Sequence, residues 1–233
     1  RENRAPAAPG SPEVGMYNLL IGLGAGLAAF LLFFATGLVD WWGALFPAVL
    51  AAGVTYFLLA RRTLAKLESL YRDAQADIMA KRIQPGIDKI KSGFELAKWQ
   101  FFVEPQVHAQ LGSLLYMLEK YDEARPHLEK SFVRIGQARA MYGALLYRAK
   151  DDAKMEKVFE EAVKYTKNDG LLWSVYAWCL NDRGQRDKAL AVLARATKEN
   201  PSDEKLKENL LSLQNGKDLR MKAYGMEWWA YRL

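Results

Sequence analysis

Only one charged side chain, Asp40, lies between residues 14 and 60. Residues 14–39 form a run of 26 without a charge, and residues 41–60 form a second run of 20. An apolar helix needs about 20 residues to cross a hydrocarbon layer of about 30 Å. The pattern therefore predicts two transmembrane helices, over about residues 16–39 and 43–60. The short turn between them carries Trp41 and Trp42, as in an interfacial aromatic belt.

Small residues predict how these two helices pack, because helices in lipid approach each other through Gly and Ala. The expected packing face consists of Gly22, Gly26, Ala48 and Ala52. Three alternatives to the hairpin exist. A cleaved signal is disfavoured by the length of the apolar region and by the lack of a cleavage site. A soluble core hairpin is disfavoured by the scarcity of charge. A single span followed by a re-entrant or interfacial segment stays open.

Basic residues flank the apolar region on both sides, and the turn between the two spans has none. Because Lys and Arg collect on the cytoplasmic side, both termini and everything after residue 60 are predicted to be cytoplasmic. The residues behind this orientation are Arg1, Arg4, Arg61, Arg62, Lys66 and Arg72. Residues 1–15 are rich in Pro, Ala and Gly and predict a flexible tail. The chain begins with Arg rather than Met, so part of the native N-terminus is expected to be missing.

Composition narrows the function classes. Residues 1–60 carry a net charge of −1 and the whole chain +6, so residues 61–233 carry +7. A modest positive excess suits an anionic inner leaflet. The basic residues alternate with acidic ones and form no recognition motif, which disfavours nucleic-acid binding. The single Cys179 excludes an intrachain disulfide, in agreement with a reducing compartment.

After residue 60 apolar residues recur at three- and four-residue steps, and no strand pattern is sustained. The fold class is therefore all-α. Breaks are expected at residues 84–86, 104–105, 150–152, 168–170, 181–184 and 200–201. They leave helices of about 12 to 16 residues with short connectors, which is the spacing of a helical-repeat protein.

The clearest repeat unit covers residues 170–203 and has 34 residues. Its apolar and small residues stand at Trp173, Tyr176, Ala177, Leu180, Ala189, Leu193, Ala196 and Pro201. This pattern resembles a tetratricopeptide repeat (TPR), in which small residues let two antiparallel helices approach and a Pro ends the second. The resemblance implies an α-solenoid of three to four helix pairs. Together with the two predicted spans, it suggests a membrane-anchored member of the TPR family.

The same frame appears upstream, with weaker matches. We predict repeats over about residues 71–104, 105–135, 136–169 and 170–203, the first of them degenerate. Residues 61–84 are expected to form a linker helix that leads into the first helix of that degenerate repeat. Residues 204–216 are expected to be a capping helix, because a terminal repeat would otherwise expose its seam.

Residues that carry chemistry are scarce. His108 and His127 are the only histidines, and neither has a Cys or carboxylate at metal-ligand spacing, so a structural role is favoured for both. No phosphate-binding Gly loop follows a strand, and no Ser or Cys nucleophile has a recognisable base. We therefore predict no enzymatic activity, no cofactor, no metal and no small-molecule substrate.

Helical repeats offer a groove lined by the first helix of each pair. The predicted partner-binding residues are Met79, Arg82, Ser113, Tyr116, Met117, Tyr147, Arg148, Trp178 and Asn181. Tyr116, Tyr147 and Trp178 recur every 31 positions. Packing between neighbouring repeats is the alternative role for these three aromatic residues. The TPR family's basic clamp for a C-terminal carboxylate is not present in this pattern.

The last 15 residues, 219–233, are unusually aromatic for a chain terminus. Such a tail rarely stays in water. Three placements stay open: folded back on the last repeat, lying at the membrane interface, or docked in a partner. The residues expected to make the contact are Tyr224, Trp228, Trp229 and Tyr231.

Two functional hypotheses follow from these observations. The first is a membrane-anchored adaptor that binds protein partners, or helps to assemble a membrane complex, at the cytoplasmic face. The second is an intrinsic accessory subunit of a large transport, respiratory or photosynthetic machine, held mainly through its transmembrane helices. A membrane-anchored regulator that has lost an active neighbouring domain is a weaker third hypothesis.

Overall fold

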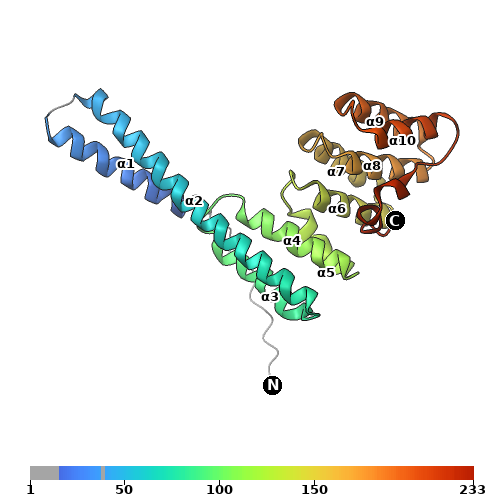
Figure 1. The fold of residues 1–233 in the computed structure, drawn as a ribbon, viewed down its shortest axis with the longest axis horizontal. Coiled ribbons are helices and arrows are strands. Elements are labelled where there is room, and N and C mark those ends of the chain that lie inside the picture. Colours follow the sequence, from blue (N-terminus) through green and yellow to red (C-terminus); the bar gives the residue numbers. More distant parts are fainter. Residues whose placement is uncertain (1–15, 38–39) are drawn as a thin grey trace, which may run out of the picture. The chain divides into compact units, whose positions relative to one another are not determined.

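The computed structural model describes residues 16–37 and 40–233 (Figure 1). Within those residues every regular element is a helix, so the all-α prediction is confirmed. The chain divides into two compact units, Arg1–Glu104 and Pro105–Leu233, and each is described by itself. The predicted flexible tail, residues 1–15, lies outside the described residues, and so do residues 38–39 at the end of the first apolar run.

The first unit is organised around one long helix. This helix, α2 (Trp41–Met79), has 39 residues and a length of roughly 58 Å. Its N-terminal half pairs with α1 (Tyr17–Ala35), and its C-terminal half pairs with α3 (Ile83–Ser92). A 3₁₀ turn, η1 (Gly93–Leu96), follows α3. Each half of α2 therefore has its own partner helix.

The single charge of the apolar stretch has a structural role. Asp40 is the N-cap of α2, and its carboxylate accepts a hydrogen bond of 2.9 Å from the backbone N–H of Gly43. An acidic N-cap satisfies one of the free N–H groups of the first turn and complements the helix dipole. Asp40 thus starts the second helix at the hairpin turn.

The second predicted span and the predicted linker helix form one unbroken helix. Nothing between Gly53 and Pro85 breaks a helix, so α2 continues from apolar into charged sequence without a bend residue. The break expected at residues 84–86 is wrong in position. The chain turns at Ala80–Arg82, and Pro85 lies in the first turn of α3, where its missing N–H costs no hydrogen bond.

The hairpin of α1 and α2 is apolar and close-packed along one seam. A Cβ added at Gly26 would lie 2.8 Å from the carbonyl oxygen of Ala48 and 2.9 Å from Cβ of Ala52. A Cβ added at Gly22 would lie 3.0 Å from the carbonyl oxygen of Ala52. Glycine at both positions is what lets the two backbones approach this closely.

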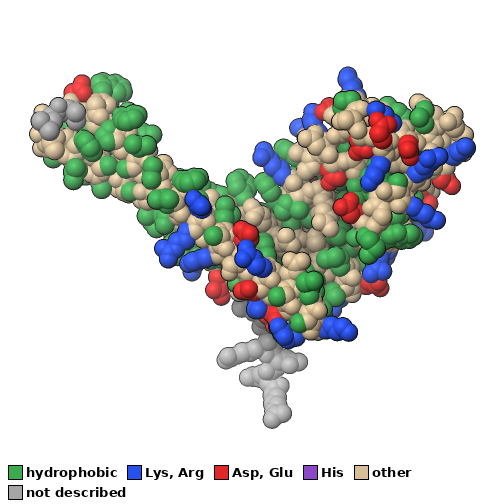
Figure 2. All heavy atoms as spheres, viewed as in Figure 1, with side chains coloured by type: hydrophobic (Ala, Val, Ile, Leu, Met, Phe, Trp, Pro, Cys, Tyr) green, Lys and Arg blue, Asp and Glu red, His purple; other side chains and the backbone are tan. Residues whose placement is uncertain are grey.

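Away from that seam the hairpin exposes its apolar side chains. The most apolar windows of α1 and α2 have mean hydropathies of 2.1 and 1.9, and only 17% and 11% of them are buried. In the core helix of a soluble protein most of that surface would be covered. In Figure 2 the coloured side chains of this arm are green, with no blue among them and with red only at its tip. Both helices are thus long and apolar enough to cross a membrane.

The second unit is a series of antiparallel helix pairs, which confirms the predicted helical repeats. The pairs are α4 (Val103–Met117) with α5 (Tyr121–Glu129), α6 (Gly136–Arg148) with α7 (Asp152–Tyr165), and α8 (Gly170–Asp182) with α9 (Arg186–Glu199). A last helix, α10 (Glu204–Gln214), packs on α9. The tail then forms a 3₁₀ turn, η2 (Met221–Tyr224), and a short helix, α11 (Met226–Trp229).

One turn type recurs along the chain. After α2, α4, α6, α8 and α10 a residue with positive φ is followed by a backbone N–H that donates five residues back. In the second unit these bonds include Lys120 N to Leu115 O at 2.9 Å and Gln185 N to Leu180 O at 2.9 Å. This is the Schellman end of a helix, and it reverses the chain tightly. The turn between α2 and α3 is of the same type, so this pair resembles the repeats that follow it.

Small residues set the spacing inside the helix pairs. A Cβ added at Gly112 would lie 2.9 Å from the backbone nitrogen of Leu128, and one added at Gly143 would lie 2.4 Å from the ring of Phe159. In the third pair Ala177 and Leu193 take the corresponding places and are fully buried. The second helix of each pair therefore lies against a position where the first helix has almost no side chain.

The Gly143 contact predicts a sharp effect of one methyl group. We expect Gly143→Ala to lower the free energy of unfolding by about 2 kcal/mol, because the fully buried Phe159 ring has no open space to move into. Chemical denaturation followed by helical circular dichroism measures this loss. Adding Phe159→Leu should recover part of it. Strictly additive losses in the double variant would show that the ring is not the cause.

Candidate functional site

The candidate site is the surface of the second unit on which the chain's own tail lies. Figure 1 shows the dark red end of the chain returning beside α6 and α8. We call this surface the tail-binding face. Among its residues that contact the tail are Tyr116, Arg148, Ser174, Trp178 and Asn209.

A buried polar cluster holds the first part of the tail. Asn209 of α10 accepts a hydrogen bond of 2.7 Å from the backbone N–H of Arg220 and donates one of 3.2 Å to Ser174 Oγ. Ser174 Oγ lies 2.8 Å from the hydroxyl of Tyr224, which also donates to the carbonyl of Gly170 at 3.3 Å. Ser174 and Asn209 are fully buried, so losing the tail would leave their polar atoms without these partners.

Aromatic and basic residues hold the second part of the tail. The ring of Trp228 meets that of Trp178 edge to face, with centroids 5.3 Å apart. The hydroxyl of Tyr116 donates to the carbonyl oxygen of Tyr231, and Arg148 donates to that of Arg232. Edge-to-face pairs add about 1 kcal/mol to the stabilisation from buried area. The tail thus crosses the first helices of all three pairs.

The structure distinguishes among the four tail residues named from the sequence. Tyr224, Trp228 and Tyr231 are buried, whereas Trp229 is 55% exposed. Of the three placements left open by the sequence, the structure has the tail folded back on the repeats. It extends beyond the last repeat, as far as α4.

The three recurring aromatic residues do not share one environment. Tyr116 is fully buried beneath the tail, so it is not accessible to a ligand while the tail is in place. Tyr147 and Trp178 contact each other edge to face at 5.6 Å and join neighbouring helix pairs. Packing between repeats, which the sequence left as an alternative for these aromatics, is therefore the arrangement of Tyr147 and Trp178.

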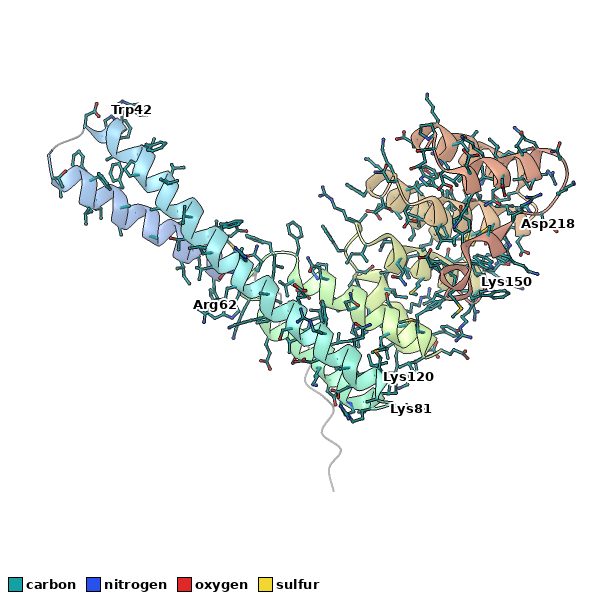
Figure 3. All side chains as sticks on the ribbon, viewed as in Figure 1. Trp42, Arg62, Lys81, Lys120, Lys150 and Asp218 are labelled. Atoms are coloured by element: carbon teal, nitrogen blue, oxygen red, sulfur yellow. The ribbon has the colours of Figure 1, made fainter. Side chains whose placement is uncertain are left out.

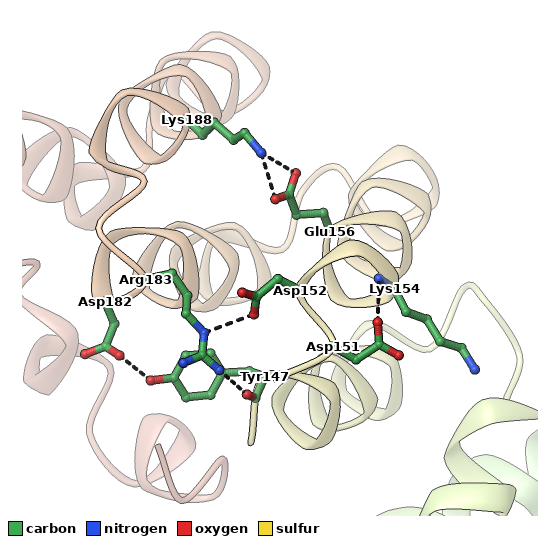
Figure 4. A network of polar contacts seen from close by, with 8 residues as sticks. All are labelled: Tyr147, Asp151, Asp152, Lys154, Glu156, Asp182, Arg183 and Lys188. Carbon is green, nitrogen blue, oxygen red and sulfur yellow. Dashed lines mark hydrogen bonds and ion pairs between the residues drawn. The ribbon is translucent and has the colours of Figure 1, made fainter. Parts of the chain in front are cut away.

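A polar network ties Tyr147 further into the scaffold (Figure 4). Its hydroxyl donates to Asp182, and its carbonyl accepts from Arg183. Arg183 also bonds Asp152 at 3.0 Å, and its guanidinium lies 4.3 Å from the Tyr147 ring centroid. Arg183 therefore connects the end of α8 to both helices of the preceding pair. In Figure 4 Lys188 and Glu156 form a second link between these pairs.

The remaining predicted groove residues are divided between the two units. Ser113 and Asn181 are partly exposed, and Met117 and Arg148 are exposed. Met79 and Arg82 belong to the first unit. Arg82 there pairs with the buried Asp77, whose pKa is lowered by hydrogen bonds from Lys89 and Arg82. Partner binding by any of these residues stays a prediction.

Burial keeps the hydroxyl groups of this surface neutral. It raises the pKa of Tyr224 to about 12, and it raises the pKa values of Tyr116 and Tyr231 above their ordinary range. The same cause raises the pKa of the Cys179 thiol, which is fully buried in α8. None of these groups is poised to lose a proton near neutral pH. The face is suited to hydrogen bonding and apolar contact.

A wide hollow of about 1140 Å³ follows the N-terminal ends of α6, α8 and α10. Its charged lining contains four basic and four acidic residues, so it favours neither sign of ligand. These residues are Arg134, Lys164, Lys167, Lys205, Asp169, Asp203, Glu204 and Glu227.

The sequence did not predict that the two histidines would meet. The antiparallel arrangement of α4 and α5 places His108 Nδ1 2.8 Å from His127 Nδ1. Among the described residues no group of three or more potential metal ligands occurs, so this pair has no cluster of ligands around it. The two histidines are 19 residues apart and lie on either side of the turn between α4 and α5. In a helical hairpin this spacing could have indicated the contact. Burial, with smaller effects of His127 and Lys130, lowers the pKa of His108 to about 4.

This lowered pKa predicts that the second unit loses stability in mild acid. Between pH 6.5, the ordinary pKa of histidine, and pH 4 the unfolded chain binds a proton at His108 that the folded chain does not. We expect the free energy of unfolding to fall by about 1 kcal/mol from pH 7.5 to pH 5, after allowance for solvent screening. Urea titrations at the two pH values measure it. His108→Gln should remove most of the difference, and an unchanged difference would contradict the assignment.

No family model and no curated protein matches this sequence. Among solved structures 22 chains are similar to it. One of these is "MamA RS-1 ArsTM double mutant". It has a TM-score of 0.48 and 18% sequence identity, and the match covers 72% of this chain and 93% of that one.

Proposed function

We propose that this chain is a membrane-anchored scaffold that binds protein partners at the cytoplasmic face. The hairpin of α1 and α2 would be the anchor, and the helix pairs of the second unit would be the binding module. The single observation that carries the anchor is the exposed apolar surface of both hairpin helices. It ends abruptly at Arg61 and Arg62, as expected where a helix leaves the hydrocarbon.

The dimensions of the hairpin support this proposal. Trp41 and Trp42 pack against each other at one end, with ring centroids 4.4 Å apart. Arg62 follows Trp42 by 20 residues, or roughly 30 Å of helix, which is the thickness of a hydrocarbon core. Near Arg62 a second aromatic pair, Tyr17 and Trp99, has its centroids 5.5 Å apart. Two aromatic belts at this separation are typical of membrane-spanning segments.

The basic residues that follow α2's apolar half favour a cytoplasmic position for the second unit. Figure 2 shows blue side chains gathered where the green arm ends. In the proposed function the tail-binding face is the partner surface, and the tail covers it until a partner takes its place. The exposed Met117 and Arg148 would be contacts that a partner reaches first.

The anchor is tested by carbonate extraction of membranes that contain the full chain. Single cysteines, introduced into a Cys179→Ala variant of that chain, are labelled from outside. We expect the chain to remain in the pellet. A cysteine in place of Trp42 should be labelled from the non-cytoplasmic side, and one in place of Lys217 should be labelled only after lysis. Release of the chain by carbonate would remove the proposal.

A second function, accessory subunit of a membrane machine, is favoured by two other glycines. Gly24 and Gly53 have nothing within 4 Å of an added Cβ, so the outer faces of the hairpin carry small residues that no described residue covers. Such positions are suited to a neighbouring transmembrane helix. Exchanging residues 16–60 for an unrelated hairpin separates the two functions. A scaffold keeps its partners after the exchange, whereas a subunit loses them.

A further inference from the structure

A polar junction fastens the start of α1 to the segment that follows η1. Asn18 is buried, and its amide donates to Thr63 Oγ1 at 3.0 Å and to Gln100 Oε1 at 3.1 Å. The backbone N–H groups of Tyr17 and Asn18 donate to the carbonyls of Lys98 and Trp99 at 3.3 and 3.1 Å. These bonds use N–H groups that a helix leaves free in its first turn. They hold Trp99 at the level where the apolar surface of α1 begins.

A cavity of about 150 Å³ lies beside this junction. That is the volume of about five water molecules in the liquid, which is room for a phosphate group and the first atoms attached to it. Two basic side chains one helical turn apart, Arg62 and Lys66, line it together with polar and apolar residues. The complete lining is Asn18, Leu59, Arg62, Thr63, Lys66, Leu96 and Trp99.

The charges of this cavity are not balanced by the protein. No acidic residue lines it, and among the described residues no carboxylate pairs with Arg62 or Lys66. Farther along these helices two basic residues do have acidic partners: Arg72 of α2 pairs with Glu68, and Lys89 of α3 pairs with Asp77. Two cations that share a cavity repel each other unless an anion lies between them. A phosphate, with several acceptor oxygens, fits this donor set.

The position of the cavity indicates where such a phosphate would come from. Arg62, labelled in Figure 3, lies on α2 just beyond the apolar stretch that pairs with α1. Tyr17 and Trp99 form their aromatic pair at the same level, and such rings lie among lipid headgroups. Leu59 and Leu96 add an apolar wall, which suits the glycerol and first acyl carbons of a lipid better than a free anion.

We propose that the cavity bounded by Arg62, Lys66, Asn18 and Trp99 binds the phosphate of an anionic phospholipid headgroup. This inference depends on the proposed membrane anchor. Arg62 and Lys66 neutralise the phosphate, Trp99 borders it at the interface, and the junction around Asn18 keeps the cavity open. The bound lipid would hold the segment of residues 96–100 on the bilayer surface.

The test uses the full chain in nanodiscs that contain phosphatidylcholine with 20% phosphatidylglycerol, roughly the anionic content of a charged leaflet. Native mass spectrometry counts the anionic lipid that stays bound. We expect Arg62→Gln to weaken retention roughly five-fold, and Arg62→Gln with Lys66→Gln more strongly, at about one factor of five per charge. Arg61→Gln is the matched control, because it removes the same charge from the neighbouring position, which does not line the cavity.

Three results would overturn the headgroup site. Equal losses for Arg61→Gln and Arg62→Gln would mean general surface attraction, and equal retention of both lipids by the unaltered chain would mean no preference. Stabilisation of the chain by 10 mM inorganic phosphate in pure phosphatidylcholine discs, lost in the Arg62→Gln variant, would assign the cavity to a free anion. Carbonate extraction of the same variants keeps the two proposals apart: a chain that stays in the membrane but shows no lipid preference refutes only this inference.

Discussion

Replacing Gly26 by isoleucine is expected to separate α1 from α2. A Cβ at this position already lies within 2.8 Å of the carbonyl oxygen of Ala48, and backbone atoms cannot rotate away as a side chain can. Overpacking typically costs about 1–3 kcal/mol, and a branched side chain against backbone belongs at the upper end. We therefore expect the hairpin to lose about 3 kcal/mol. Unfolding by sodium dodecyl sulfate in mixed micelles, followed by tryptophan fluorescence, measures the loss.

Gly24→Ile is the matched control for this experiment. It places the same side chain in the same helix two residues away, where an added Cβ meets nothing within 4 Å. Its midpoint of unfolding should stay close to that of the unaltered chain. Equal losses at residues 24 and 26 would mean that isoleucine acts through α1 alone and that the seam with Ala48 does not hold the hairpin together.

Removing the tail is expected to uncover the tail-binding face without unfolding the helix pairs. Five large side chains of residues 219–233 are buried: Leu219, Met221, Tyr224, Trp228 and Tyr231. Their burial stabilises the folded chain by roughly 10 kcal/mol before the entropy of ordering the tail is subtracted. We expect the truncated chain to lose about 4 kcal/mol of its free energy of unfolding and to bind several-fold more of a hydrophobic dye. Helical circular dichroism should stay nearly unchanged, since α4 to α10 keep their own core.

Two adjacent tryptophans provide a finer version of this prediction. Trp228 is 6% exposed and packs on Trp178, whereas its neighbour Trp229 is 55% exposed. Trp228→Ala should cost about 3 kcal/mol and raise dye binding, and Trp229→Ala should cost less than about 0.5 kcal/mol. Denaturant titration and dye fluorescence of the full chain measure both. If the two variants behave alike, the tail is not held on this face in solution.

The tail experiment also bears on the proposed scaffold. A partner that binds the tail-binding face competes with the chain's own residues, so its apparent affinity is reduced by the fraction of time the tail is docked. Trp228→Ala should then increase partner capture from detergent-solubilised membranes. A partner that instead binds to the docked tail would be lost by the same substitution. Increased capture therefore assigns binding to the tail-binding face, and lost capture assigns it to the tail.

Much of the architecture could be predicted from residue pattern alone. The scarcity of charge before residue 61 is a property of composition and does not depend on any particular contact. It was therefore enough to predict the two long apolar helices. The helix pairs followed from apolar spacing and from small residues such as Gly112 and Gly143 at regular positions. Helix ends were harder, because Pro85 ends a helix in one context and fits a first turn in another.

The site was harder to predict than the fold. The repeat pattern predicted equivalent positions on successive helices for Tyr116, Tyr147 and Trp178. It did not predict which residues these rings would contact. The tail reaches Tyr116 from 115 residues away, and His108 meets His127 only because α4 and α5 are antiparallel. Contacts at such separations depend on how whole elements pack, and no periodicity in the sequence records them.

What the sequence determined by itself is the character of each segment: two helices long and apolar enough to cross a membrane, then amphipathic helix pairs. Only the tertiary structure decided that the tail occupies the face predicted for partners. It alone placed Arg62 and Lys66 together with Asn18 and Trp99 around one cavity. The physical reason is that periodicity is a local property of the chain and can be recognised in the sequence. A site is formed by residues that are distant in sequence and come together only when the chain folds.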